Sequence, residues 1–83
     1  MLHVNYSLRR VKLNRQGYAP GGNYWGAGQP LYVCEYRADG ETRVETGYLR
    51  ANSRAEAKRQ AKMHIALFYH TYVDKVCLWR GNV

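Results

Sequence analysis

The sequence predicts a small α+β fold, in which an antiparallel sheet of three to four strands carries one amphipathic helix across one face. Three observations predict it: apolar and polar residues alternate in two segments, an Asp39-Gly40 turn pair follows the second segment, and a capped helix begins after Ser53. The predicted order of elements is strand, loop, strand, strand, helix and strand. A chain of 83 residues holds one small core, so we expect a single domain spanning residues 1–83.

The first predicted strand lies near the start of the chain, where apolar residues alternate with polar ones from Val4 to Leu8. The alternation then changes phase, because Val11 and Leu13 fall on the opposite face of a regular strand. One extra residue at Arg9-Arg10 would restore it. We therefore expect a bulge or bend there that redirects one arginine.

A glycine-rich segment follows from Gly17 to Tyr32, with five of the eight glycines, both prolines and one of the two tryptophans. Glycine permits bends that other residues resist, and large aromatic side chains bury much surface. The segment therefore either covers one end of the core as a lid or presents Tyr24 and Trp25 to a partner. It matches neither the G-x-G-x-x-G fingerprint nor a P-loop, which argues against a nucleotide site.

The next two strands form a predicted hairpin. A two-residue type I′ turn at Asp39-Gly40 would place Ala38 opposite Glu41 and Val33 opposite Thr46. One face would then carry the expected core residues, which are Leu31, Val33, Val44 and Tyr48. The other face would be an exposed surface of Tyr32, Cys34, Tyr36, Arg43 and Glu45. Gly47 marks a second expected bulge.

The predicted helix begins with a capping box formed by Ser53 and Glu56. Its core stripe is Ala57, Ala61, Ile65, Phe68 and Tyr72, and we expect it to end near His70 or Thr71. A basic ridge lies on its other side, formed by Arg54, Lys58 and Lys62 with Arg59 beside them. A last strand from Val76 to Arg80 would join an edge of the sheet, with Trp79 facing either the sheet or solvent.

Charge is the strongest functional signal, because 13 Lys and Arg residues against six acidic residues give a net charge of +7. Most cations gather in two segments, and four of the acids lie between them. This segregation favours binding to the phosphate backbone of nucleic acid. The candidate phosphate contacts are Arg9, Arg10, Lys12, Arg15, Arg50, Arg54, Lys58, Arg59 and Lys62. Tyr32 and Tyr36 would stack on bases if their face is open.

Other classes of function find little support in the sequence. The three histidines and two cysteines lack metal-site spacing, and no cofactor motif or catalytic pair stands out, so we expect neither a metal nor a cofactor nor an enzyme. Cys34 and Cys77 could form one disulfide, but buried free thiols fit better. No secretory signal or bilayer-length apolar run is present, so we expect a cytoplasmic protein that does not bind membranes. An uncovered sheet edge would allow a homodimer.

Two stretches resemble small uncharacterised proteins of bacteriophages and prophages. One is Asn14-Arg15-Gln16-Gly17-Tyr18 followed by Gly21-Gly22-Asn23-Tyr24-Trp25-Gly26-Ala27-Gly28-Gln29-Pro30-Leu31-Tyr32, and the other is the junction from Leu49 to Lys58. The resemblance implies a phage accessory protein, a class in which many members bind or block host machinery. Together with the segregated charge, it leads us to expect a protein that acts in the host cytoplasm on nucleic acid or a host nucleoprotein complex, as an anti-CRISPR-like inhibitor of host defence. It implies no catalytic residues. The alternatives are a protein-binding inhibitor anchored by Tyr24 and Trp25, and a structural or homo-oligomeric phage component.

Overall fold

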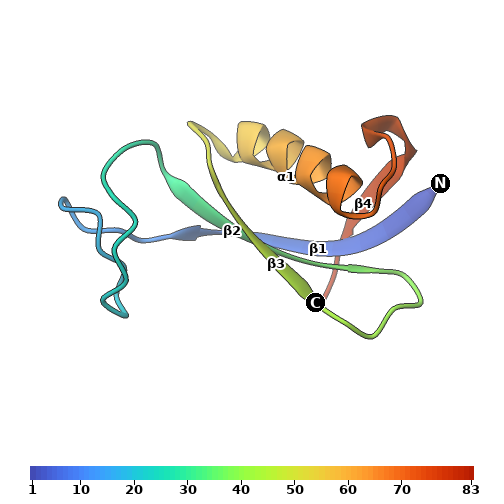
Figure 1. Cartoon of the computed structure of the whole chain (residues 1–83), viewed down its shortest axis with the longest axis horizontal. Helices are drawn as coiled ribbons and strands as arrows, with labels where there is room; N and C mark the ends of the chain where they lie inside the picture. Colours follow the sequence, from blue (N-terminus) through green and yellow to red (C-terminus); the bar gives the residue numbers. More distant parts are fainter.

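The computed structural model describes all 83 residues as a four-stranded sheet with one helix across one face (Figure 1). The elements are β1 (Leu2–Val11), β2 (Leu31–Ala38), β3 (Glu45–Arg50), α1 (Arg54–Phe68), a short 3-10 turn η1 (Val73–Lys75) and β4 (Val76–Arg80). The strands lie in the order β3-β2-β1-β4. The predicted α+β class and the predicted order of elements are therefore confirmed.

The sheet is mixed rather than wholly antiparallel. β1 pairs antiparallel with β2, and β2 pairs antiparallel with β3, so β1 and β3 run in the same direction. α1 carries the chain back to the end of the sheet where β3 began, and β4 then runs parallel to β1, from Leu2 opposite Val76 to Tyr6 opposite Arg80. A helical crossover is the usual connection between parallel strands, which is why the last strand departs from the antiparallel expectation.

The core lies on the face of the sheet that we expected to be exposed. Tyr32, Cys34 and Tyr36 are buried beneath α1, where Ala57, Ala61 and Ile65 pack against them. The register between β1 and β2 causes this reversal, because Tyr6 lies opposite Tyr36 and Leu8 lies opposite Cys34. Burying the apolar face of β1 therefore turns the tyrosine-bearing face of β2 inward.

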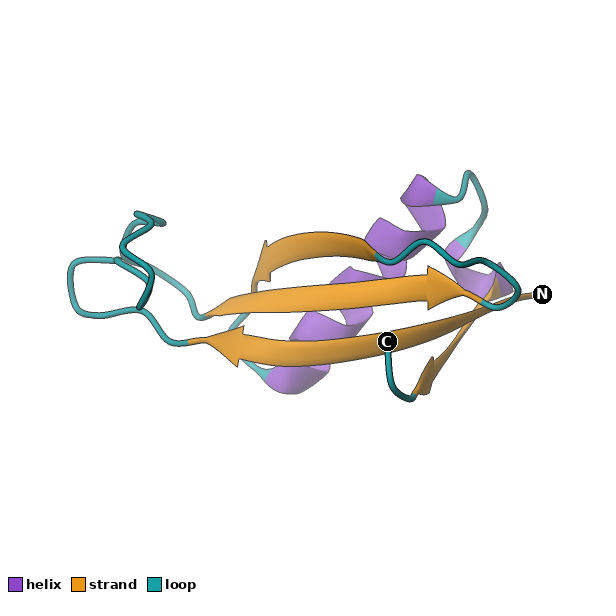
Figure 2. Cartoon of the chain, turned by 90° about the horizontal axis from the view of Figure 1, so that it is seen from below, coloured by secondary structure: helices purple, strands orange, loops and turns teal.

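The face away from α1 is covered only in part (Figure 2). Leu31 and Val33 are buried on it, together with Asn5, whose Nδ2 donates to the carbonyl oxygen of Asn82 at 3.1 Å. The residues after β4 thus fold back across this face. Trp79 is partly exposed at its margin and donates from Nε1 to Asp39 Oδ1 at 3.0 Å.

Neither expected bulge is present. β1 and β2 pair without interruption from Val4 opposite Ala38 to Val11 opposite Leu31. The apolar pattern changes phase at Val11 because that residue lies on the other face of the sheet, beside buried Leu31, and not because the strand is bulged. β3 is also regular through Gly47.

Gly47 instead allows a close approach of the helix to the sheet. A Cβ atom at this position would lie 2.8 Å from His64 Nε2, which is closer than real Cβ contacts. The same nitrogen lies 3.1 Å from the hydroxyl of Tyr36. A glycine in β3 therefore makes room for a side chain that hydrogen-bonds across the core.

The hairpin turn is at the predicted position, but the predicted register is wrong by two residues. The N–H of Glu41 donates to the carbonyl of Ala38 at 3.0 Å, yet pairing begins only at Glu45, which lies opposite Tyr36. Gly40 has φ +89° whereas Asp39 has no positive φ, so the turn is not type I′. The negative φ of Asp39 also excludes type II′, and turns of types I and II splay the strands, which explains the delayed pairing.

The helix begins as predicted, with Ser53 as its N-cap. Ser53 Oγ accepts from the N–H of Glu56 at 3.2 Å, and the Glu56 carboxylate accepts from the N–H of Asn52 at 3.3 Å. α1 ends at Phe68, slightly before the expected exit, and His70 follows with φ 55°. Phe68 and Tyr72 are exposed, so the buried stripe is shorter than predicted. No helix has both the length and the apolar character needed to cross a membrane.

Candidate nucleic-acid interface

The helix ridge, defined as Arg54, Lys58, Arg59 and Lys62, is the first part of the candidate interface. Arg54 Nη2 donates to the carbonyl oxygen of Leu8 at 2.6 Å, and Lys58 Nζ lies 6.0 Å from the centroid of the Tyr6 ring. These two contacts place the flank of α1 that carries Arg54 and Lys58 directly along β1. Lys62 continues the row at the groove between α1 and β4, where Asp74 also lies.

The spacing of the helix ridge suits a row of phosphates. Arg54 and Lys62 are eight residues apart, which is about 12 Å at 1.5 Å per helical residue. One strand of a duplex carries a phosphate for roughly every 3.4 Å of axis, so this length covers about three or four of them. Arg59 is exposed next to the row.

The cations of β1 and the following loop divide between the two faces of the sheet. Arg10 lies opposite Tyr32 and therefore shares the face that carries α1, whereas Arg9 lies opposite Val33 on the other face. Arg10 is two residues from Leu8, or roughly 7 Å along the strand, and so extends the helix ridge at its Arg54 end. Lys12 and Arg15 are exposed beyond the end of β1. The structure thus joins Arg10 to the helix ridge and separates Arg9 from it.

Arg50 has a role that its sequence context does not reveal. Its guanidinium donates to three carbonyl oxygens of the glycine-rich loop, those of Trp25 at 2.6 Å, Gly26 at 3.0 Å and Gln29 at 2.7 Å. Arg50 therefore fixes the base of the loop to the end of β3. Of the nine predicted phosphate contacts, Arg50 and Arg54 also hold backbone groups of the protein itself.

Tyr32 and Tyr36 cannot stack on bases in this fold, because they are only 6% and 1% exposed. Burial, with smaller effects from nearby Tyr69, Glu45 and Cys34, raises the pKa of Tyr36 to about 12. Burial, with a smaller effect from Glu35, also raises the pKa of the Cys34 thiol to about 11. The prediction that these tyrosines form an open surface is wrong because α1 covers them.

The glycine-rich loop is an ordered hairpin that projects from one end of the sheet (Figure 1). Tyr18 and Tyr24 pair across it with ring centroids 4.9 Å apart, and the N–H of Trp25 donates to the carbonyl of Gly17 at 2.8 Å. None of the aromatic residues that precede β2, which are Tyr18, Tyr24 and Trp25, belongs to the main core cluster. Tyr24 is 65% exposed, and Trp25, at 37%, packs beside Tyr48 with centroids 4.7 Å apart. The loop is therefore not a lid on the main core.

Few of the positive charges are neutralised within the molecule. Arg43 and Glu45 form the one ion pair, at 2.8 Å, and it involves no residue of the helix ridge. Asp39, Glu41 and Glu45 lie at the β2–β3 connection, at the end of the sheet opposite the glycine-rich loop. Three of the six acidic residues thus lie at one end of a molecule measuring 41 × 23 × 20 Å.

The titratable side chains form no other assembled site. Cys34 and Cys77 are both free thiols, and no three His, Cys, Asp or Glu side chains group together in a way that could hold a metal ion. Comparison with protein-family models, with curated proteins and with solved structures gave no match.

Proposed function

We propose that this protein is a non-enzymatic binder of nucleic acid, free or within a nucleoprotein complex, and that it binds through the helix ridge and Arg10. The observation that carries the proposal is a row of cations without acidic partners, aligned along β1 by the contacts of Arg54 and Lys58. Such a row neutralises phosphates whatever the base sequence. Binding is therefore expected to be salt-sensitive and weakly sequence-specific.

Substitution of Lys58 and Lys62 tests this mode of binding. Lys58→Gln with Lys62→Gln removes two charges from the row, and Arg37→Gln with Lys75→Gln removes two charges elsewhere, since Arg37 lies opposite Asn5 on the face away from α1. The first pair should weaken binding to labelled duplex and single-stranded DNA and RNA by roughly tenfold, about 0.7 kcal/mol per contact. The control pair should change it less than about twofold.

Two results would count against the proposal. One is a wild-type protein that binds none of these nucleic acids at low salt. The other is an equal loss of affinity in both double variants, which would indicate a diffuse effect of net charge. Circular dichroism before each titration shows that the variants are folded.

For the biological role we propose inhibition of a nucleic-acid-dependent host defence, supported by the resemblance to phage-encoded proteins. Expression of the chain in bacteria that carry CRISPR-Cas immunity should restore plating of a targeted phage. The Lys58→Gln, Lys62→Gln variant should restore it less well. Equal restoration of plating by wild type and variant would show that inhibition does not depend on the helix ridge.

A second candidate function, binding to a host protein, is favoured by the exposure of Tyr24 and Trp25 on an ordered, projecting loop. Rigid aromatic side chains are common interface anchors. A tagged pull-down from host cells, with and without nuclease, distinguishes the two: a partner retained after nuclease and lost in Tyr24→Ala supports the loop. Tyr24 is the better probe, since its side chain is the more exposed of the two.

A further inference from the structure

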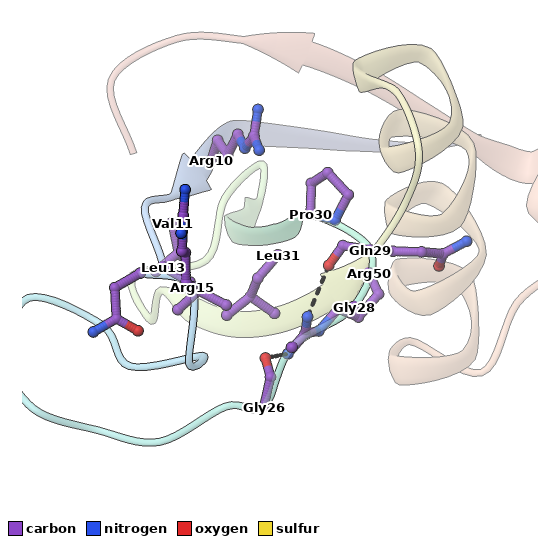
Figure 3. A pocket seen from close by; sticks show the side chains of 12 residues that line it. Arg10, Val11, Leu13, Arg15, Gly26, Gly28, Gln29, Pro30, Leu31 and Arg50 are labelled. Atoms are coloured by element: carbon purple, nitrogen blue, oxygen red, sulfur yellow. Dashed lines mark hydrogen bonds between the residues drawn. The ribbon is translucent and has the colours of Figure 1, made fainter.

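A cleft of about 260 Å³ lies where the glycine-rich loop leaves the sheet. Figure 3 shows Arg10 and Arg15 on its β1 side and Arg50 across from them, with dashed bonds from Arg50 to loop carbonyls. No carboxylate is among the side chains that line it. Arg15 and Arg50 therefore bring two guanidinium groups from two segments to one small space, whereas Arg10 borders it from the α1 face of the sheet.

Two features prepare this cleft for an anion. The three carbonyl contacts hold Arg50 in place, so little side-chain freedom is lost when a ligand binds. Residues 26–29 also line the cleft, and their backbone N–H groups donate to no other group of the chain. Gly26 and Gly28 have φ values of +83° and +149°, and unpaired amides in such irregular backbone form anion-binding concavities.

The size and charge of the cleft select the class of anion. Clefts for drug-sized organic molecules usually exceed about 300 Å³, so this one suits a small group. Guanidinium forks match phosphate oxygens, and a terminal phosphate carries roughly −1.5 to −2 charges at neutral pH whereas an internal phosphodiester carries about −1. We propose that the cleft binds a terminal phosphate group. The proposal rests on the proposed function only in naming a nucleic-acid strand end as one source of that group, the other being a free phosphate compound.

Two probes distinguish the sources. Inorganic phosphate is titrated while the amide NMR signals of Gly26 and Gly28 are followed, and single-stranded oligonucleotides of one sequence are compared with and without a 5′-phosphate. We expect the two glycine signals to shift with phosphate, and the 5′-phosphorylated strand to bind about tenfold more tightly. Shifts without any preference for the phosphorylated strand would assign the cleft to a free phosphate compound.

Arg15→Gln is the test variant, because Arg15 is exposed and donates no hydrogen bond within the protein, and Arg80→Gln is its charge-matched control. Arg15→Gln should abolish most of the preference for the 5′-phosphate, and Arg80→Gln should keep it. Lys58→Gln with Lys62→Gln should weaken the binding of both oligonucleotides by the same factor and leave the ratio of their affinities unchanged. Silent glycine signals together with equal binding of the two strands would overturn the cleft proposal while leaving the helix ridge intact. Phosphate binding without any nucleic-acid binding would support the cleft proposal and overturn the proposed function of the helix ridge.

Discussion

At the residue scale, Cys34 links the packing of the core to pH. Its thiol is buried between β2 and α1, and burial raises its pKa from 9.0 to about 11. The unfolded chain therefore loses this proton first as the pH rises above 9, so the stability that the protonated thiol contributes is complete below pH 9 and lost as the pH passes 11.

We predict that the free energy of unfolding changes little with Cys34 ionisation at neutral pH and falls steeply above pH 9. Cys34→Ala should lower stability at neutral pH through the lost packing and should make the alkaline fall shallower. Urea unfolding at several pH values measures both effects. An unchanged alkaline slope in the variant would contradict the assignment to Cys34, and Cys77→Ala is the matched control.

A second prediction at this scale concerns Gly47 and His64. Gly47→Ala should destabilise the fold by about 1 kcal/mol, because the new Cβ displaces the imidazole that lies 3.1 Å from the Tyr36 hydroxyl. In a His64→Ala background the same change should cost much less. Thermal unfolding of the four proteins gives the coupling energy, and additive effects would show that the two sites do not interact.

The roles of single residues were predictable from sequence where they depend on near neighbours. The cap at Ser53 needs only Glu56 three positions later, and the structure confirms this prediction. Gly47 and Arg50 depend on partners far along the chain, namely His64 and the loop carbonyls. No local pattern reveals such partners, so Gly47 was expected to be a bulge and Arg50 a phosphate contact.

At the scale of elements, the glycine-rich loop depends on glycine for two different reasons. Gly17 has φ +96°, and a Cβ there would lie 2.3 Å from the carbonyl carbon of Gly26. Gly22 has a similar φ of +91°, but a Cβ there would meet nothing within 4 Å. Gly22→Ala therefore carries only the cost of a left-handed alanine, about 1 to 2 kcal/mol, whereas Gly17→Ala adds a clash with backbone.

We predict that Gly17→Ala disorders the loop and that Gly22→Ala does not. Hydrogen exchange at the Trp25 amide reports the difference, since this amide donates to the carbonyl of Gly17. Exchange should accelerate more than about tenfold in Gly17→Ala. The melting temperature of the sheet should stay nearly constant in both, because the main core contains no residue from between β1 and β2. Equal exchange in the two variants would contradict this account.

The elements were predicted more reliably than their register. Alternation and capping gave the strands and the helix, but the hairpin register was derived from an assumed turn type. Asp39 is instead held from outside the hairpin, since its N–H donates to the carbonyl of His3 and its carboxylate accepts from Trp79. These tertiary contacts accompany a turn other than type I′, and they could not be counted from the sequence.

At the scale of the whole molecule, the segregated charge predicts how binding responds to salt. Five contacts, four from the helix ridge and one from Arg10, should give a slope of log affinity against log salt of about −4.5, from about −0.9 per phosphate. Lys58→Gln should reduce the magnitude of this slope by roughly 0.9. Fluorescence anisotropy between 50 and 200 mM salt measures it. A slope near zero would exclude phosphate contacts as the basis of binding.

The composition of the chain predicted the basic surface, but it could not predict which face of the sheet would be open. That choice follows from the pairing of β1 with β2 across the long glycine-rich loop, which fixes Tyr6 opposite Tyr36. The hairpin alone presents two plausible core faces. Only the pairing of β2 with β1 decides between them, and it places the tyrosines of β2 in the interior.

The parallel pairing of Leu2 with Val76 has a consequence for the order of folding. These residues are nearly the full chain apart in sequence. Bringing them together costs the entropy of closing a long loop before their contact contributes any stabilising free energy. The β2–β3 hairpin and α1 are local and can form early, whereas β4 must dock late. Substitutions that weaken the packing of β4 should then increase the unfolding rate and leave the folding rate almost unchanged. Unfolding therefore begins with the detachment of this strand.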